Sequence, residues 1–154
     1  HSIAVSDDGS LWVGLFGPGG IYHLAPNGEQ FEQVLKGGTV ESILAVGNRV
    51  YAGVRSKGLM VYDRQSAKWL ATDFDNYNLG SVWQIVEDKL GRIWVATSDR
   101  GLAILDPVKM SLDFIDKQAG LASNDVRAIV TTPGNHLWLG TATGIASLKF
   151  NNNR

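Results

Sequence analysis

The most informative stretch of the chain is residues 81–105, SVWQIVEDKLGRIWVATSDRGLAIL. It contains apolar runs at Val82 to Val86, Ile93 to Thr97 and Gly101 to Leu105, and a further run follows at Ser111 to Ile115. Short apolar runs bounded by Asp- and Gly-rich turns are typical of β-strands joined as hairpins. The stretch therefore predicts a four-stranded antiparallel meander.

The same pattern recurs along the chain as an apolar–aromatic–apolar–small segment. The segments are Leu11 to Gly14, Val50 to Gly53, Ile93 to Ala96 and Leu137 to Gly140, and their aromatic residues are spaced by 39, 43 and 44 residues. A period of roughly 40 to 50 residues matches one four-stranded blade of a β-propeller. Helical repeats of similar period are excluded because no segment between these anchors has the apolar spacing of an amphipathic helix.

We therefore predict an all-β fold of β-propeller blades, built from four four-stranded antiparallel repeats in a single domain, residues 1–154. The approximate blades are residues 2–38, 39–80, 81–124 and 125–154. The first repeat begins inside its innermost strand at Ser2, and the fourth stops after its third strand at Phe150. The chain is expected to form part of a propeller, or a propeller that is assembled by oligomerisation.

The strands of each repeat are apolar on both faces, so each small sheet needs a cover on two sides. Radial stacking of the blades supplies that cover. The aromatic anchors are then expected between successive blades, where large rings fill the widening wedge. The glycine that follows them is expected to allow close packing of the blades.

Composition bounds the function. The chain has 14 basic and 15 acidic side chains, a formal net charge of −1 and no cysteine. A nucleic-acid partner is not expected, because the chain has no excess of positive charge. No contact of this segment with a membrane is expected either, since no apolar run approaches about 18 residues. The three histidines, His1, His23 and His136, lack the spacing of paired metal ligands, so we expect no metal, no cofactor and no catalytic triad.

Two repeats resemble the two-component-regulator propeller repeat. The resemblance is carried by Asp88 to Gly91 with Ile93 to Thr97 and Gly101-Leu102, and by Leu137 to Thr141 with Gly144-Ile145. The first two repeats follow the pattern more loosely. The resemblance implies a periplasmic, extracytoplasmic sensor segment of a bacterial hybrid histidine kinase or diguanylate cyclase, which often recognises a glycan. It implies no enzymatic activity for this chain.

Repeat alignment predicts which side chains meet at one face. In a propeller, the loops between strands two and three and the loops between blades share a face, beside the starts of the inner strands. We predict ligand-binding residues there, namely Glu41, Arg55, Trp83, Arg100 and Arg127. Phe16, Lys57, Tyr77, Asn78, Asp99, Asn124 and Asp125 fall on the same face. Aromatic rings with arginines suit a small-molecule or oligosaccharide ligand, such as a sugar or a carboxylated glycan.

Two other functions stay open at this point. One is a propeller-type lyase or glycan-degrading enzyme fragment, which needs a base and a histidine on matching strand ends. Glu41, Trp83 and Arg127 occupy those positions and suit binding better than proton abstraction. The other is a protein–protein interaction scaffold. Self-association that completes the propeller is also expected, because open end blades would leave apolar faces in water.

Overall fold

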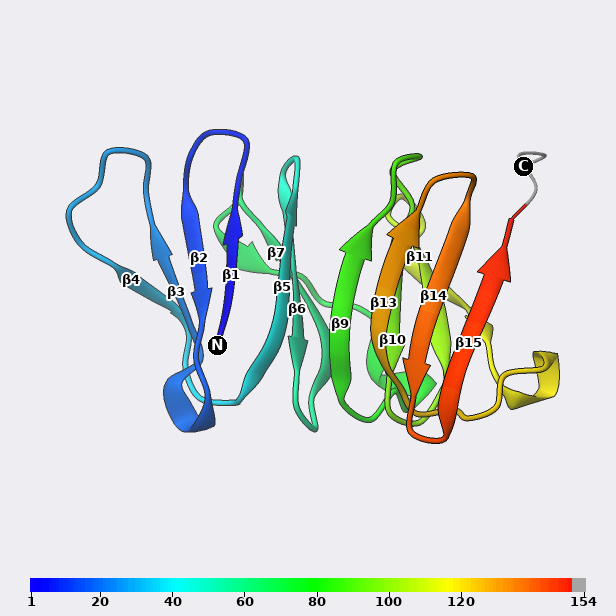
Figure 1. Ribbon diagram of the computed structural model, residues 1–154. Helices are drawn as coiled ribbons and strands as arrows, with labels where there is room; N and C mark the ends of the chain where they lie inside the picture. Colours follow the sequence, from blue (N-terminus) through cyan, green and yellow to red (C-terminus); the bar gives the residue numbers. More distant parts are fainter. Residues whose placement is uncertain (151–154) are drawn as a thin grey trace.

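The computed structural model describes residues 1–150 and contains four antiparallel sheets, called blades 1 to 4 here (Figure 1). Blade 1 contains β1 (Ser2–Val5), β2 (Leu11–Gly14), β3 (Ile21–Leu24) and β4 (Glu32–Leu35). Blade 2 contains β5 (Val40–Val46), β6 (Arg49–Val54), β7 (Gly58–Asp63) and β8 (Lys68–Trp69). Blade 3 contains β9 (Val82–Glu87), β10 (Ile93–Thr97), β11 (Leu102–Asp106) and β12 (Ser111–Ile115). Blade 4 contains β13 (Val126–Thr132), β14 (His136–Thr141) and β15 (Gly144–Lys149).

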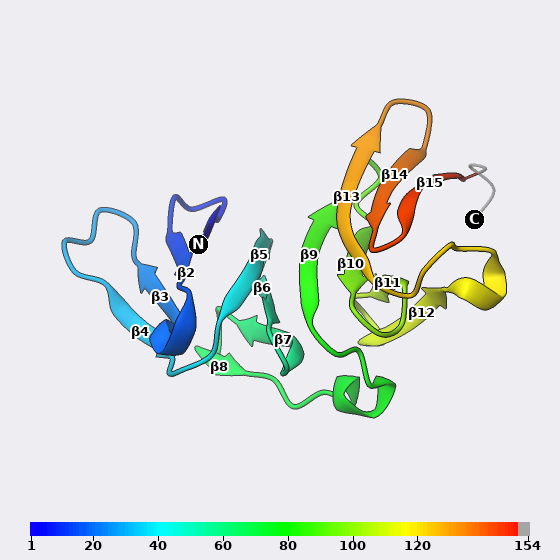
Figure 2. The same ribbon diagram turned by 60° about the horizontal axis from the view of Figure 1, so that its bottom comes forward.

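Each sheet is a meander, in which the strands pair in chain order. The blades follow one another in a curved row, with blades 1 and 4 at its two ends (Figure 2). The predicted all-β fold of propeller blades is confirmed, including the three-stranded sheet at the end of the described chain. No helix within residues 1–150 has the length and apolar character to cross a membrane.

Blade 2 differs from the other blades in the length of its outer strand. β8 contains two residues and ends at Trp69, whereas β4 and β12 contain four and five residues. The backbone N–H of Leu70 still donates to Val61 O at 2.8 Å, and the chain then leaves the sheet. It turns through the 3-10 helix η2 (Phe74–Tyr77), which inserts the fully buried ring of Phe74 into the core between blades 2 and 3. Blade 2 thus buries this ring in place of further backbone pairs between β7 and β8.

The apolar core consists of three clusters, one at each contact between neighbouring blades. Trp12, Tyr51 and Trp94 each lie almost fully buried in one of them, which confirms the predicted role of these anchors. Trp138 is an exception, because its side chain stays 46% exposed. Within residues 1–150 no further blade lies over this face of blade 4, so the position of Trp138 between blades stays a prediction.

A hydrogen bond from backbone to side chain accompanies each of these apolar contacts. The N–H groups of Ile43, Ile85 and Ile129 donate to side-chain oxygens of the preceding blade, on Ser2, Ser42 and Gln84, at 3.0, 3.0 and 2.7 Å. The three acceptors hold the same register position in their inner strands. These bonds fix each blade against the next along the inner strands.

Candidate functional site

The inner strands of blades 2, 3 and 4 each contain a β-bulge, and the extra residue is a predicted site residue. The register shifts around Glu41 in β5, around Trp83 in β9 and around Arg127 in β13. A bulge leaves one residue without a direct partner, bends the strand and re-aims its side chain. The bulges therefore set three chemically different side chains at equivalent positions of neighbouring blades.

Four side chains from different blades form a row in which aromatic rings alternate with guanidinium groups. The guanidinium carbon of Arg55 lies 5.5 Å from the ring centroid of Phe16 and 5.7 Å from that of Trp83. The guanidinium carbon of Arg127 lies 5.4 Å from the Trp83 ring on the far side of the row. These separations are within the range of cation–π attraction. We call Phe16, Arg55, Trp83 and Arg127 the aromatic–arginine row.

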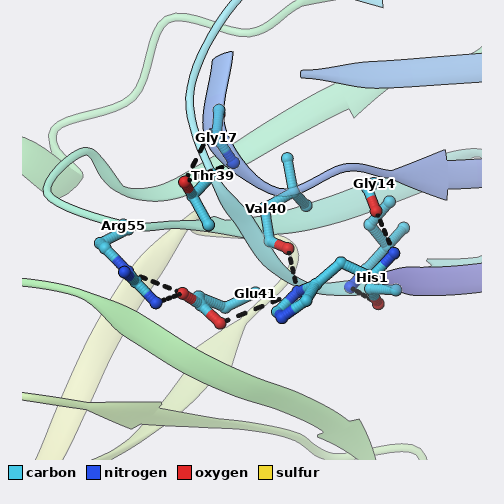
Figure 3. Close-up of polar contacts among 9 residues, drawn as sticks. His1, Gly14, Gly17, Thr39, Val40, Glu41 and Arg55 are labelled. Atoms are coloured by element: carbon cyan, nitrogen blue, oxygen red, sulfur yellow. Dashed lines mark hydrogen bonds and ion pairs between the residues drawn. The ribbon is translucent and has the colours of Figure 1, made fainter. Parts of the chain in front are cut away.

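Two carboxylates hold the arginines of the row. Glu41 accepts from Arg55 Nε at 2.8 Å and lies 2.5 Å from its terminal nitrogen, and His1 Nδ1 lies 3.9 Å from the other Glu41 oxygen (Figure 3). Asp125 accepts from Arg127 Nε and a terminal nitrogen at 3.0 and 2.7 Å. The second oxygen of Asp125 accepts from Trp83 Nε1 at 3.1 Å. Carboxylate contacts at their edges and ring contacts at their faces thus orient both guanidinium groups.

The row is accessible and its charges are balanced. The side chain of Phe16 is 63% exposed, and the side chains of Arg55 and Arg127 are 45% and 60% exposed. The hydrogen bond and the negative charge of Asp125 raise the pKa of Arg127, which keeps this side chain cationic. Glu41 and Asp125 offset the two positive charges. A ligand at this row therefore meets aromatic faces and fixed hydrogen-bonding groups with little net charge.

Arg100 does not take part in the row. Its terminal nitrogen donates to Tyr77 O at 2.8 Å, and its guanidinium carbon lies 4.5 Å from the ring centroid of Phe114. These contacts tie it to η2 and to β12, the outer strand of blade 3. The structure thus brings together four of the five predicted residues, Glu41, Arg55, Trp83 and Arg127, and places Arg100 elsewhere.

The site also includes two residues that the sequence places on this face without naming them as ligand-binding residues. Phe16 follows β2 and Asp125 precedes β13, so both belong to the loops that repeat alignment groups with the inner-strand starts. Neither residue carries a sequence signal of its own, since single exposed apolar side chains and loop carboxylates are common. Their contacts with Arg55 and Arg127 depend on the spacing of the blades.

A second concave feature lies beside the short strand β8. A cavity of about 780 Å³ is bordered by Leu59 of β7, by Trp69 and by Phe74 of η2, with Lys57 and Asp99 among its lining residues. Within residues 1–150, no group of three His, Asp or Glu side chains is placed to hold a metal ion.

Comparison with known proteins identifies the repeat. Residues 76–99, which run from η2 into the loop after β10, match the two component regulator propeller family. This is the region whose sequence follows the repeat pattern well. No curated protein matches the chain by sequence.

Solved structures match nearly the whole chain. The extracellular domain of BT4673 from B. thetaiotaomicron, a proposed one component system, matches with a TM-score of 0.75 and 21% identity over 97% of this chain and 21% of that chain. The extracellular domain of BT3049 from the same organism, a proposed hybrid two component system, matches with a TM-score of 0.72 and 25% identity over 94% of this chain and 19% of that one. The computationally designed Ika4 protein matches with a TM-score of 0.70 and 16% identity over 97% of this chain and 90% of its own.

The chain spans about a fifth of the length of the two B. thetaiotaomicron domains. Its fold is that of a portion of a propeller domain, and its repeat is that of the two component regulators.

Proposed function

We propose that this chain is a ligand-sensing segment of a bacterial signalling receptor. Two findings support the proposal: the repeat of the two component regulators and the similarity of the fold to extracellular propeller domains. The receptor is of the two-component or cyclic-dinucleotide type, and the segment lies on its periplasmic side. The chain binds and does not catalyse. Its ligand site is the aromatic–arginine row with its two carboxylates.

The alternation of rings and guanidinium groups is the observation that carries this proposal. Trp83 has two arginines, Arg55 and Arg127, within 6 Å of its ring centroid, and Phe16 extends the same row into blade 1. Sugar rings present apolar C–H faces and hydroxyl edges, so they are recognised by aromatic faces flanked by planar, oriented hydrogen-bonding groups. A glycan fragment fits this row.

Charge balance narrows the class of glycan. An anionic sugar would have to compete with Glu41 for Arg55 and with Asp125 for Arg127, and the displaced carboxylate would lose its charge-assisted hydrogen bonds. A neutral sugar can donate its hydroxyl groups to the same carboxylates without breaking either ion pair. We therefore propose a neutral oligosaccharide as the ligand.

The ion pairs of Glu41 with Arg55 and of Asp125 with Arg127 favour binding over catalysis. A general base needs a free acceptor within hydrogen-bond reach of the substrate proton. Glu41 and Asp125 instead orient Arg55 and Arg127, as in a rigid recognition surface. This supports a sensor over a lyase or glycan-degrading enzyme.

The test is calorimetric titration of the chain with a panel of neutral oligosaccharides of glucose, mannose, xylose and galactose, with galacturonate oligomers alongside. We expect at least one neutral oligosaccharide to bind. Replacement of both Trp83 and Arg127 by alanine should weaken that binding by about a hundredfold, because truncating a central aromatic or arginine typically costs about 2 kcal/mol or more.

Arg100→Ala is the matched control, because it removes an arginine from the same blade as Trp83 but outside the row. It should leave the affinity unchanged. Equal affinity of the Trp83→Ala/Arg127→Ala variant and the unmodified chain would place the ligand elsewhere and overturn the assignment. Tighter binding of galacturonate oligomers than of every neutral oligosaccharide would overturn the ligand class.

A further inference from the structure

The cavity beside β8 borders a backbone edge that the outer strand of blade 2 leaves open. Leu70 N–H donates to Val61 O at 2.8 Å, so the backbone groups of Val61 face the outer strand. Every second residue of a strand directs its backbone groups to the same edge, so those of Leu59 face this edge as well. In a continued ladder Leu59 would lie opposite Thr72, but both residues instead line the cavity of about 780 Å³. The pairing of β7 with the outer strand thus ends where the cavity begins.

Blades 1 and 3 cover the equivalent position with their own outer strands. Ile21 and Leu102 hold the position of Leu59, because each pairs with the small residue near the end of the second strand. On their other side they pair with Leu35 of β4 and with Ile115 of β12. Within residues 1–150, blade 2 has no such aliphatic residue paired with Leu59.

The glycine before the third strand shows the same difference between the blades. Gly20, Gly58 and Gly101 have nearly the same positive φ, at 72°, 74° and 76°. A Cβ on Gly20 or Gly101 would collide with a backbone oxygen of β4 or β12. The atom nearest to a Cβ on Gly58 would be Gly80 O, at 3.8 Å. The space that the backbone of the outer strand takes in blades 1 and 3 is therefore open in blade 2.

The open edge is internal to the described chain and has apolar side chains on both faces of its sheet. The residues that line the cavity fall within residues 56–99, in blades 2 and 3 and in the segment that joins them. Leu59 and Phe74 belong to the core cluster between blades 2 and 3, whereas Met60 and Trp69 pack on the cluster between blades 1 and 2. An extended chain at this edge would therefore place side chains of both faces against apolar groups.

We propose that the cavity binds a short peptide, which adds to the open edge of β7 as an extended strand. A peptide fits because the open position is one that a strand backbone occupies in blades 1 and 3. Strand addition supplies main-chain hydrogen bonds, and pockets for alternate side chains supply specificity. The peptide runs antiparallel to β7, as β4 and β12 run to their neighbours. Its residue opposite Leu59 exchanges backbone hydrogen bonds with it and is aliphatic, as Leu35 and Ile115 are.

The outer strand of blade 3 supplies the sequence of a probe. Residues 114–117, Phe-Ile-Asp-Lys, contain the isoleucine that pairs with Leu102 and the residues on either side of it. In acetyl-Phe-Ile-Asp-Lys-amide the charges of Asp and Lys balance. Its Ile would lie opposite Leu59 and its Phe opposite Met60. The probe needs no residue before Phe, because the paired end of β8 closes the edge beyond Met60.

Titration of the isotope-labelled chain with this peptide, followed by NMR, tests the proposal. Ordering a short flexible peptide costs free energy, so we expect a dissociation constant of about 0.1 to 1 mM. The amide signals of Gly58, Leu59 and Met60 should shift along one saturation curve. The amide signals of Trp83 and Arg127 should stay in place, because neither residue lines the cavity. The result is therefore independent of the ligand proposed for the aromatic–arginine row.

Two N-methylated peptides provide the matched comparison. N-methylation of the Ile removes the N–H that donates to Leu59 O and sets a methyl group against β7, so affinity should fall by about tenfold or more. N-methylation of the Phe blocks an N–H on the other edge of the added strand and should change affinity by less than about twofold. No saturable binding at about 5 mM peptide would overturn the proposal. Equal affinities of the two N-methylated peptides, or shifts confined to residues outside the cavity lining, would also overturn it.

Discussion

At the residue scale, Asp88 holds together the turn that defines the repeat. One of its oxygens accepts the backbone N–H groups of Leu90 and Arg92 at 2.9 and 3.0 Å. The other accepts from Arg92 Nε at 2.5 Å and from the buried Trp94 Nε1 at 2.9 Å. Burial raises the pKa of this carboxyl, but the hydrogen bonds from Trp94 and Arg92 outweigh it, and the pKa lies below its ordinary value of 3.8. The aspartate of the motif is thus a partner of the tryptophan that follows it.

Asp88→Asn should destabilise the chain by about 1 to 3 kcal/mol near neutral pH, because asparagine has one acceptor oxygen in place of two and its NH2 group would face two of the donors. The lowered pKa means that the native state favours the ionised carboxylate. This stabilisation is present above the ordinary pKa and is lost as the pH falls through the lowered one. Urea unfolding at about pH 7 and about pH 3 should therefore show a smaller difference between the two proteins in acid.

Asp113→Asn is the control for this experiment, since Asp113 is an exposed carboxylate in the same blade. It should change the free energy of unfolding little at either pH. An Asp88→Asn chain as stable as the unmodified one near neutral pH would show that the network around Asp88 adds nothing to stability.

At the element scale, the small residue that ends the second strand sets how closely blades approach. A Cβ atom on Gly53 would lie 2.7 Å from the backbone oxygen of Val82 in blade 3. A Cβ on Gly14 would lie 2.5 Å from a methyl group of Val40 in blade 2. The expected role of these glycines in close blade packing is confirmed. Gly140 differs, because a Cβ there would lie 3.4 Å from Ala128 of its own blade, an ordinary contact.

Gly53→Ala should destabilise the chain by about 1 to 3 kcal/mol, because the backbone of blade 3 must move to admit the methyl group. Gly140→Ala makes the same chemical change at the equivalent position of blade 4 and should change stability by less than about 0.5 kcal/mol. Thermal unfolding of both variants at low protein concentration measures the difference. Equal losses would mean that the close approach to Val82 does not limit stability.

At the scale of the whole molecule, the apolar packing within residues 1–150 joins consecutive blades. The three core clusters and the three side-chain hydrogen bonds each join consecutive blades. Stability in such an array is close to the sum of the blades and of the contacts between neighbours. A substitution at one contact is therefore expected to act mainly on the two blades that meet there.

The sequence by itself determined the repeated meander and the face on which the candidate site lies. Both follow from short-range information: apolar runs make the strands, turns at Asp88 to Gly91 and its counterparts join them, and the period places equivalent loops together. It also indicated Glu41, Arg55, Trp83 and Arg127, because the repeats differ there.

Only the tertiary structure decided how these side chains meet. The way one sheet lies against the next decides the bulges at Glu41, Trp83 and Arg127. It also places Arg55 near two aromatic rings, and it places Arg100 against Tyr77 and Phe114 instead. The short β8 likewise reflects the burial of Phe74 between two blades. Local sequence propensity does not predict such contacts, because they join residues that are tens of positions apart. These residues come together only when the blades pack.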